Sequence, residues 1–320
     1  MTQSRGKTKR KIVSDPVDRR SFIKAATAFA VVPPTTVYSQ TIERGRFSTD
    51  DVPLARQHLL EMVNVERGRR GLSQLQLDNL GCRVADQHAE DMLDGHFLSH
   101  WGRDGRKPYQ RYSFAGGTDA IQENVSAAGR ISSMTPNGVQ DTLVDMHESM
   151  IDEAPPNDGH RRTILSPHHT HVGFGVAARE YSVRLDEIYI ARYAEIYPIE
   201  RRARPASHIK FSGRLLNSKH EVNGIYVYHE PLPTPPKIEW LRIPRSYSLP
   251  DTFAQLAPRL PGNYVYLNGT KGVIETGSKG SFKTPVTLFK EPGINTIVLW
   301  IRRAKNEAPF PVTQVCIQCE

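Results

Sequence analysis

The hydrophobic pattern of the chain changes once, near residues 198–207, and this change limits what the chain can fold into. Before it, apolar residues recur at helical spacing over about 53–70, 79–94 and 137–153. After it, short runs such as "GIYVYHEP" and "NTIVLWIRR" alternate with Gly, Pro and Asn turns, and no helix of any length is predicted. We therefore expect an α+β half, the linker "PIERRARPAS", and then a small all-β sandwich of ~110 residues.

The end of the first half should supply its strands. "HVGFGVAA" and "EIYIARYAEIY" are rich in β-branched and aromatic residues, and we expect them to be joined by a turn around Asp186. Residues 96–136 are rich in Gly, Ser and Asp, which predicts mostly loop and short helix.

The N-terminus has the features of an export signal. Arg19 and Arg20 precede the apolar run Ala25–Val32, which is too short to span a bilayer. The segment "RRSFIK" resembles a twin-arginine signal, which implies export of a folded protein to the periplasm, the cell surface or the medium. We assign residues 1–40 to this signal and its tail.

The charge of the chain argues against nucleic-acid binding. The net charge is +8, but residues 1–24 alone carry +6, which leaves +2 for all the rest. A nearly neutral body lacks the basic surface of a nucleic-acid-binding protein. No other stretch is long and apolar enough to predict a membrane span in the mature chain.

The three cysteines predict neither a metal site nor a redox site. Cys82 stands alone on an apolar helix face, and Cys316 and Cys319 form a C-x-x-C spacing on a predicted strand. A zinc site of this kind needs a second pair, and a redox pair needs a helix N-terminus to lower the thiol pKa. We expect inert or incidentally oxidised thiols.

Several motifs, taken in order, resemble the CAP superfamily of cysteine-rich secretory, antigen 5 and pathogenesis-related proteins. They are "NVER", "GLSQLQLD", "ADQHAEDM", "FLSH", "ENV" and "GHRRTILSPHHTHVGFGVA", and they extend over roughly 53–197. The resemblance implies a three-layer α-β-α sandwich with a shallow cleft. We place this CAP domain at 41–200 and the β-sandwich domain at 205–320.

The resemblance also implies a cleft lined by two His and two Glu. His100 of "FLSH", Glu123 of "ENV" and His160 of "GHRR" match this pattern, and Glu153 or Glu148 would be the second carboxylate. At 100° per residue Glu153 lies on the same helix face as the apolar positions, whereas Glu148 lies nearly opposite, so helix geometry favours Glu153. Two imidazoles and two carboxylates can hold a divalent cation such as zinc.

Six other histidines are expected at the surface or in ordinary packing: His88, His96, His147, His168, His169 and His171. Pro155 and Pro156 forbid continuation of the third helix and should deliver His160 to a fixed position.

Two functions fit these residues. The first is a secreted, non-enzymatic binding module for a lipid, a peptide or a cell-envelope partner, because no Ser–His–Asp or Cys–His arrangement is recognisable. The second is a hydrolase of peptide, cell-wall or ester bonds that uses metal-assisted or general-base attack.

The export signal is directly testable. A reporter fused to residues 1–45 should leave the cytoplasm only while both arginines are intact, so Arg19→Lys with Arg20→Lys should abolish export. The measurement is reporter activity in the periplasmic and extracellular fractions. Export that survives the double substitution would contradict the twin-arginine assignment.

Overall fold

The computed structural model describes residues 45–320, so the predicted signal at 1–40 lies outside the described part of the chain. The first half contains the 3₁₀ turn η1 (Thr49–Asp51) and the helices α1 (Val52–Gly68), α2 (Asn79–Asp94), α3 (Pro108–Phe114), α4 (Pro136–Ile151) and α5 (Gly159–Ile164). Its strands are β1 (Gln76–Leu77), β2 (Ala120–Gly129), β3 (His171–Arg179) and β4 (Ser182–Ala191).

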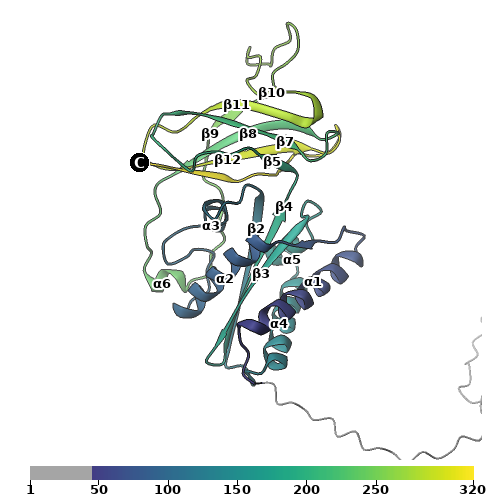
Figure 1. The fold of residues 1–320 in the computed structure, drawn as a ribbon, viewed down its shortest axis with the longest axis vertical. Helices are drawn as coiled ribbons and strands as arrows, with labels where there is room; N and C mark the ends of the chain where they lie inside the picture. The colour runs from purple at the N-terminus through teal and green to yellow at the C-terminus, as the bar shows by residue number, and fades with distance from the viewer. Residues whose placement is uncertain (1–44) are drawn as a thin grey trace, which may run out of the picture. The chain divides into compact units, whose positions relative to one another are not determined.

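These elements form three layers. The sheet has the order β1-β3-β4-β2, in which β1 pairs with β3 in parallel and the other pairs are antiparallel. Figure 1 shows α1 and α4 on one side of this sheet and α2 on the other. One core joins α1 and α4 to the side chains of β3 and β4 that include Phe174 and Leu185, and another joins α2 and α3 to Ile121, Ile188 and Ile190. The predicted α-β-α fold is confirmed.

The limits of the helices follow from local chemistry. The Asp78 side chain accepts a hydrogen bond from the backbone N–H of Gly81 at 2.6 Å, and so caps the start of α2. Thr135 caps α4 in the same way, with Pro136 as the first helical residue. At its other end, α4 stops at Ile151, ahead of Pro155 and Pro156.

Two glycines of β3 let α2 lie directly on the sheet. A Cβ added at Gly175 would lie 2.0 Å from the carbonyl carbon of Ala85, and one added at Gly173 would lie 2.2 Å from that of Gly81. Both distances are far inside van der Waals contact. The "GFG" of the sequence therefore sets the spacing between helix and sheet, while the intervening Phe174 fills the opposite core.

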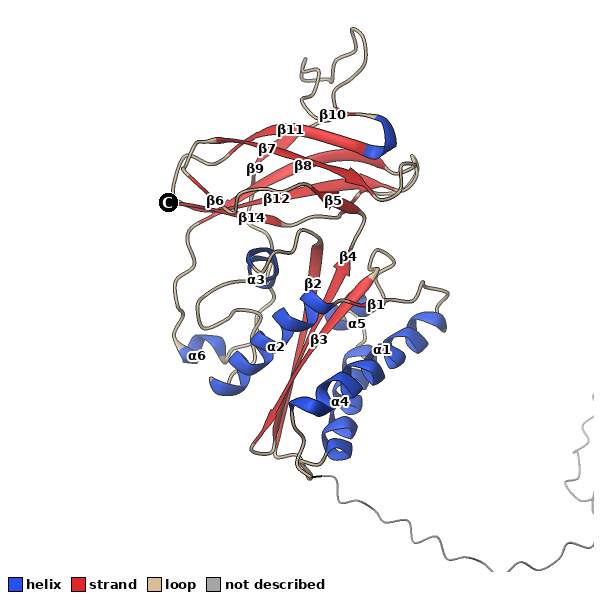
Figure 2. Ribbon diagram, viewed as in Figure 1, coloured by secondary structure: helices blue, strands red, loops and turns tan. Residues whose placement is uncertain are grey.

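The second half is all β, apart from the single turn α6 (Ile238–Leu241) and the 3₁₀ turn η2 (Ser278–Gly280). One sheet has the order β10-β11-β7-β5, with β5 (Ala194–Ile196), β7 (His208–Leu215), β10 (Glu275–Thr276) and β11 (Ser281–Thr287). The other has the order β6-β14-β12-β8-β9, with β6 (Arg202–Ala203), β8 (Glu221–Glu230), β9 (Thr252–Leu256), β12 (Gly293–Arg302) and β14 (Val315–Cys319), and β13 (Phe310–Pro311) also pairs with β12. Both sheets are visible in Figure 2.

The second of these sheets is buried on both faces. Ile297 and Leu299 of β12 pack into the core between the two β sheets, together with Phe211. On the other face, Ile294 and Cys316 pack against the tyrosines of α3. This double burial explains why "NTIVLW" is apolar without strict alternation.

Polar contacts reinforce this junction between the halves. The carboxylate of Glu230, at the end of β8, accepts hydrogen bonds from Tyr109 at 2.5 Å and from Gln110 at 2.9 Å, and it pairs with Lys107 at 2.7 Å. The backbone N–H of Cys316 donates to the Ser113 hydroxyl at 2.8 Å. The division of the chain into domains at 41–200 and 205–320 remains a prediction.

One sequence expectation was incomplete and another was wrong. Residues 96–136 are mostly loop and short helix, as expected, but they also contain the ten-residue strand β2, which was not predicted. Asp186 does not lie in a turn: the turn falls at Glu180 and Tyr181, which both have positive φ, and Asp186 is in the middle of β4. In both cases a polar sequence is stabilised as a strand by partners from elsewhere in the fold, which local composition does not report.

Among residues 45–320, no helix combines the length and the apolar character that crossing a membrane requires.

Because α2 lies so close to β3, a larger side chain at the β3 glycines should lower the stability of the fold. Gly175→Ala should destabilise the fold by about 3 kcal/mol, because the methyl group would overlap backbone atoms that cannot move without shifting α2. Gly129→Ala is the matched control, since nothing lies within 4 Å of a Cβ at that strand residue. Urea unfolding measures the stability of both variants. Equal stabilities would show that α2 can move away from β3 at little cost.

Candidate functional site

A cavity of about 1110 Å³ contains all four residues predicted for the cleft. His100, Glu123, Glu153 and His160 all line it, and Glu148, the alternative carboxylate, does not. Glu148 is instead exposed on α4. The other lining residues come mainly from β2, from α5 with the loop that follows it, and from residues 244–249 of the second half.

The first pair joins His100 to Glu123 of β2. The His100 Nδ1 lies 2.9 Å from Glu123 Oε1, and the Arg111 guanidinium of α3 forms an ion pair with the other carboxylate oxygen. The Glu123 side chain is fully buried. Burial raises the pKa of Glu123, but the charge of Arg111 and the hydrogen bond from His100 outweigh it and hold that pKa below its usual value.

Arg111 also fixes the segment that carries His100. Its guanidinium donates to the carbonyl oxygen of His100 at 2.7 Å and to that of Arg106 at 3.1 Å. One guanidinium therefore orients both members of the pair, the imidazole through its backbone and the carboxylate directly.

The second pair joins His160 of α5 to Glu153, which follows the end of α4. The His160 Nδ1 lies 2.5 Å from Glu153 Oε1, and the backbone N–H of the same histidine donates to Glu153 Oε2 at 2.9 Å. The N–H of Arg161 lies 3.4 Å from that same oxygen. Glu153 thus accepts hydrogen bonds from the backbone of the first turn of α5 and also from the imidazole ring of His160.

A segment of the second half contributes to this cavity. Pro244, Arg245, Ser246, Tyr247 and Leu249 line it together with the residues of the first half. The Tyr247 hydroxyl accepts a hydrogen bond from the backbone N–H of Glu123 at 3.0 Å, and its ring meets the His100 ring edge-on at 4.8 Å. Nearby, Trp240 of α6 packs edge-on against Trp101 at 5.2 Å. The cleft is therefore a composite of both halves.

On the opposite face of the sheet, a buried polar network lies behind His160. Asn124 donates to the backbone carbonyl of His160 at 3.2 Å and to Glu187 at 3.3 Å. Glu187 also accepts from the Tyr189 hydroxyl at 3.0 Å and lies 3.4 Å from His147 Nδ1. Burial lowers the pKa of His147, but the hydrogen bond and the charge of Glu187 outweigh it and raise that pKa.

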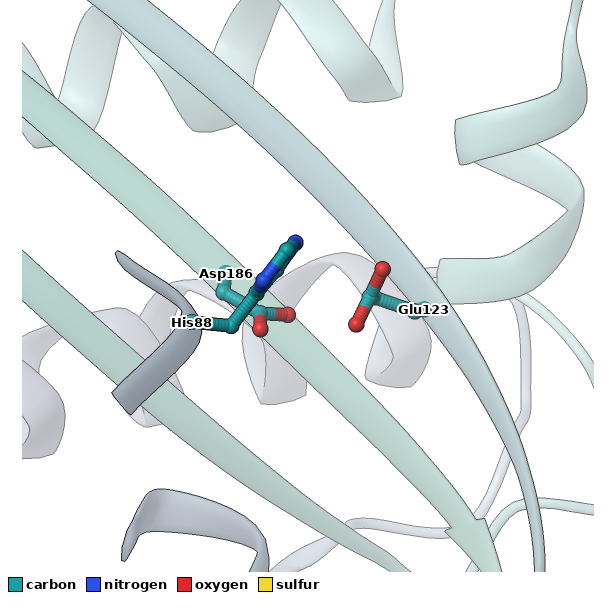
Figure 3. Close-up of side chains that lie close together, drawn as sticks. All are labelled: His88, Glu123 and Asp186. Carbon is teal, nitrogen blue, oxygen red and sulfur yellow. The ribbon is translucent and has the colours of Figure 1, made fainter. Parts of the chain in front are cut away.

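A third group of side chains includes Glu123 together with two residues buried beneath the cleft. His88 of α2, Glu123 and Asp186 of β4 place one potential ligand atom each within 4.8 Å of one another, and all three are buried (Figure 3). Both carboxylate oxygens of Asp186 and the Nδ1 of His88 lack a hydrogen-bond partner among the described residues. Three potential acceptors face one another in a buried site, and this group could hold a metal ion.

The protonation states of Asp186 and His88 can also reduce the repulsion within this group. Burial and the nearby charge of Glu123 raise the pKa of Asp186 well above its ordinary value, which favours the neutral acid. Burial and the charge of Arg111 lower the pKa of His88 to about 4, and its Nε2 donates to the carbonyl of Ser99 at 2.8 Å. In the absence of a metal ion, a neutral imidazole and a protonated Asp186 leave Glu123 as the one charged member of the group.

The expectation of surface or ordinary packing roles for the other histidines was partly wrong. His88, His147 and His169 are buried and hydrogen-bonded, and burial lowers the pKa of His169 to about 3. His168 stacks on Phe310 with ring centroids 4.1 Å apart. The amphipathic pattern of α2 could have indicated that His88 points inward, but Asp186, Glu187 and Tyr247 gave no local signal.

The cysteines take no part in the site. All three are free and buried, and burial raises the pKa of Cys316 to about 12. A thiol in this state is a poor nucleophile.

Comparison with known families identifies the first half. Residues 60–190 match the model of the Cysteine-rich secretory protein family, called CAP. This part of the chain is a CAP domain, and a β-rich region of two further sheets follows it.

This chain matches individual relatives over less than half of its own length, and it spans less than half the length of the curated relatives that it matches. The Bacillus subtilis protein YkwD is 27% identical over 118 residues, which is 37% of this chain and 40% of that protein. An extracellular protein with an SCP domain from Bacillus anthracis is 22% identical over 46% of this chain and 45% of its own, with a TM-score of 0.35. An outer surface protein of Borrelia burgdorferi is 13% identical over 46% of this chain and 98% of its own, with a TM-score of 0.36.

The buried imidazole beneath the cleft predicts a pH dependence. A histidine whose pKa is lower in the folded state contributes stability that is fully present above its unfolded pKa, near 6.5, and that is lost as the pH falls toward about 4. The titration of His88 should therefore lower the free energy of unfolding by about 2 kcal/mol between pH 7 and pH 5.

The comparison for this prediction is His88→Gln, whose amide retains a donor toward the Ser99 carbonyl but does not titrate. Its free energy of unfolding, from urea titrations at both pH values, should fall by less than that of the natural chain. Parallel pH profiles would contradict the assignment.

Proposed function

We propose that this chain is an exported, non-enzymatic binding protein whose CAP cleft takes a lipid, a peptide or a cell-envelope polymer and can bind a divalent metal ion. The observation that carries the proposal is the pairing of His100 with Glu123 and of His160 with Glu153 in the wall of one large cavity. Such paired side chains fit ligand recognition or metal binding better than a role in packing, because they line open space.

Among the described residues, the group whose ligand atoms lie within 4.8 Å of one another is His88, Glu123 and Asp186, so the proposal of a zinc ion in the cleft rests on the orientation of the two cleft imidazoles. In each pair Nδ1 faces a carboxylate, which favours the tautomer that carries its proton on Nδ1 and leaves the Nε2 lone pair available. Neither Nε2 makes a hydrogen bond to any residue of the described chain. We infer that His100 and His160 would be the ligands, and that Glu123, already engaged by Arg111, orients its imidazole. A bound zinc ion would supply Lewis acidity at this site.

Several features favour binding over catalysis. Within residues 45–320, no hydrogen bond joins a serine or cysteine side chain of the cavity to an imidazole. The cavity is also large, and residues 244–249 of the second half add apolar and polar groups to one wall. This shape suits an extended ligand held along the cleft.

Export supports the same proposal. The segment Arg19–Lys24 resembles a twin-arginine signal, and a folded CAP domain carried across the membrane would meet envelope and extracellular partners. The nearly neutral body of the chain disfavours nucleic acid as the ligand.

The metal-binding part is tested by zinc titration calorimetry on the purified protein and its variants. His100→Ala and His160→Ala should each weaken zinc binding by about tenfold or more, since each removes one nitrogen ligand. Affinity should rise with pH, because protons compete with the metal for imidazole nitrogen. Glu153→Gln should weaken binding more than the matched control Glu148→Gln.

Two outcomes would overturn parts of this proposal. If His88→Ala abolishes zinc binding and His160→Ala does not, the metal belongs to the buried group beneath the cleft. If the purified protein hydrolyses peptide, ester or cell-wall substrates, and this activity needs zinc and is lost in His160→Ala, the chain is a hydrolase rather than a binding protein.

A further inference from the structure

The loop between β9 and β10 exposes large apolar side chains at its tip. Tyr264 is 73% exposed, Val265 51% and Leu267 fully exposed. Figure 1 shows this loop projecting beyond the two β sheets. Surface apolar residues scattered singly are ordinary, but three within four positions at the end of a projecting loop form a patch. We call residues 263–268 the apolar tip.

The loop is held in place by its own hydrogen bonds. At its base the N–H of Arg259 donates to Ile274, and the N–H of Leu260 donates to Lys271, both at 2.8 Å. Nearer the tip the N–H of Tyr266 donates to Thr270 at 2.8 Å, and the Tyr266 hydroxyl turns back to the carbonyl of Pro258 at 2.7 Å. The chain thus folds one aromatic residue inward and holds the neighbouring apolar side chains outward.

At the base of the loop, the backbone at Gly272 lies close to the backbone at Pro258. Gly272 has a φ of +74°, and a Cβ there would lie 2.1 Å from the carbonyl oxygen of Pro258. Only glycine fits this position, so the two arms of the loop lie in direct backbone contact. The apolar tip is consequently presented on a stiff stem.

Positive charge flanks the tip. Residues 252–283 contain one acidic side chain, Glu275. They contain four basic side chains: Arg259, Lys271, Lys279 and Lys283. Lys283 pairs with Glu275 at 2.9 Å, which leaves the other three without an ion pair among the described residues. Lys271 lies at the stem of the tip, where its ammonium donates to the carbonyl of Gly262 at 3.4 Å.

We propose that the apolar tip inserts into the surface of an anionic lipid bilayer and anchors the second half of the chain there. A tyrosine beside aliphatic residues, with basic groups behind them, is the composition that partitions into the headgroup region. Three projecting side chains are too few for a stable protein interface, which buries about 800 Å² on each partner. A fluid bilayer needs no complementary partner surface, so a small tip is sufficient. This contact is separate from the CAP cleft and does not depend on what the cleft binds.

The test uses a fluorescent label on the full chain. Asn263→Cys places a single reactive thiol at the tip, because the three natural cysteines are buried, and an environment-sensitive NBD group is attached to it. Ser218→Cys, on the exposed turn between β7 and β8, is the matched control. Each labelled protein is titrated with vesicles of phosphatidylglycerol and, separately, of phosphatidylcholine.

We expect NBD fluorescence at position 263 to rise several-fold with phosphatidylglycerol vesicles and much less with phosphatidylcholine, and we expect no rise at position 218. Tyr264→Ser with Leu267→Ser should weaken the apparent vesicle affinity reported at position 263 by about tenfold or more. Leu216→Ser, which removes a lone exposed leucine of the same half, should leave it unchanged.

The position of the label separates the tip from the basic N-terminus, because only a label at the tip reports entry of the tip into lipid. Vesicles that bind the protein without changing fluorescence at position 263 would overturn the proposal. It would equally fail if the label at position 218 responded as strongly, or if the double serine variant kept its affinity. Failure here would leave the cleft proposal intact, since zinc titration tests a different surface.

Discussion

The buried carboxylate of Glu123 is the constraint on which the rest of the site depends. A fully buried carboxylate is tolerated only when it is paired, and Glu123 has Arg111 on one oxygen and His100 on the other. These two partners come from the α3 segment and from the loop before it, so the charge of one strand residue fixes the position of two other segments. Removing the guanidinium alone would leave an uncompensated buried charge, at a cost of about 3–5 kcal/mol.

The same residue connects the two halves of the chain through its backbone. Its N–H donates to the Tyr247 hydroxyl, and that ring packs against His100. Together with the contacts of Glu230 to Tyr109 and Gln110, this makes the β-rich region part of the wall of the cleft. The wall of the CAP cleft is therefore completed by residues that lie outside the CAP domain.

Strand β4 explains why two acidic residues in succession are both buried. Side chains alternate across a strand, so Asp186 points toward α2 and joins His88, whereas Glu187 points toward α4 and joins His147. Each acid faces an imidazole supplied by a helix. In a single sequence, "DE" before a β-rich run is typical of a turn, and only the helices on both faces make it a buried strand.

The sequence by itself determined the three long helices and the change to an all-β region, because periodicity and proline and glycine signals act over short distances. Its ordered motifs, through the family resemblance, indicated the four residues that form the two His–Glu pairs. It predicted the inward face of α4 well enough to favour Glu153 over Glu148, which is the residue that lines the cavity in the structure. Only the tertiary structure decided that residues 120–129 form a strand, that His88 lies beneath the cleft and that Tyr247 closes against His100. These features depend on side chains brought together from positions far apart in the chain, and their burial and pairing leave no local pattern in the sequence.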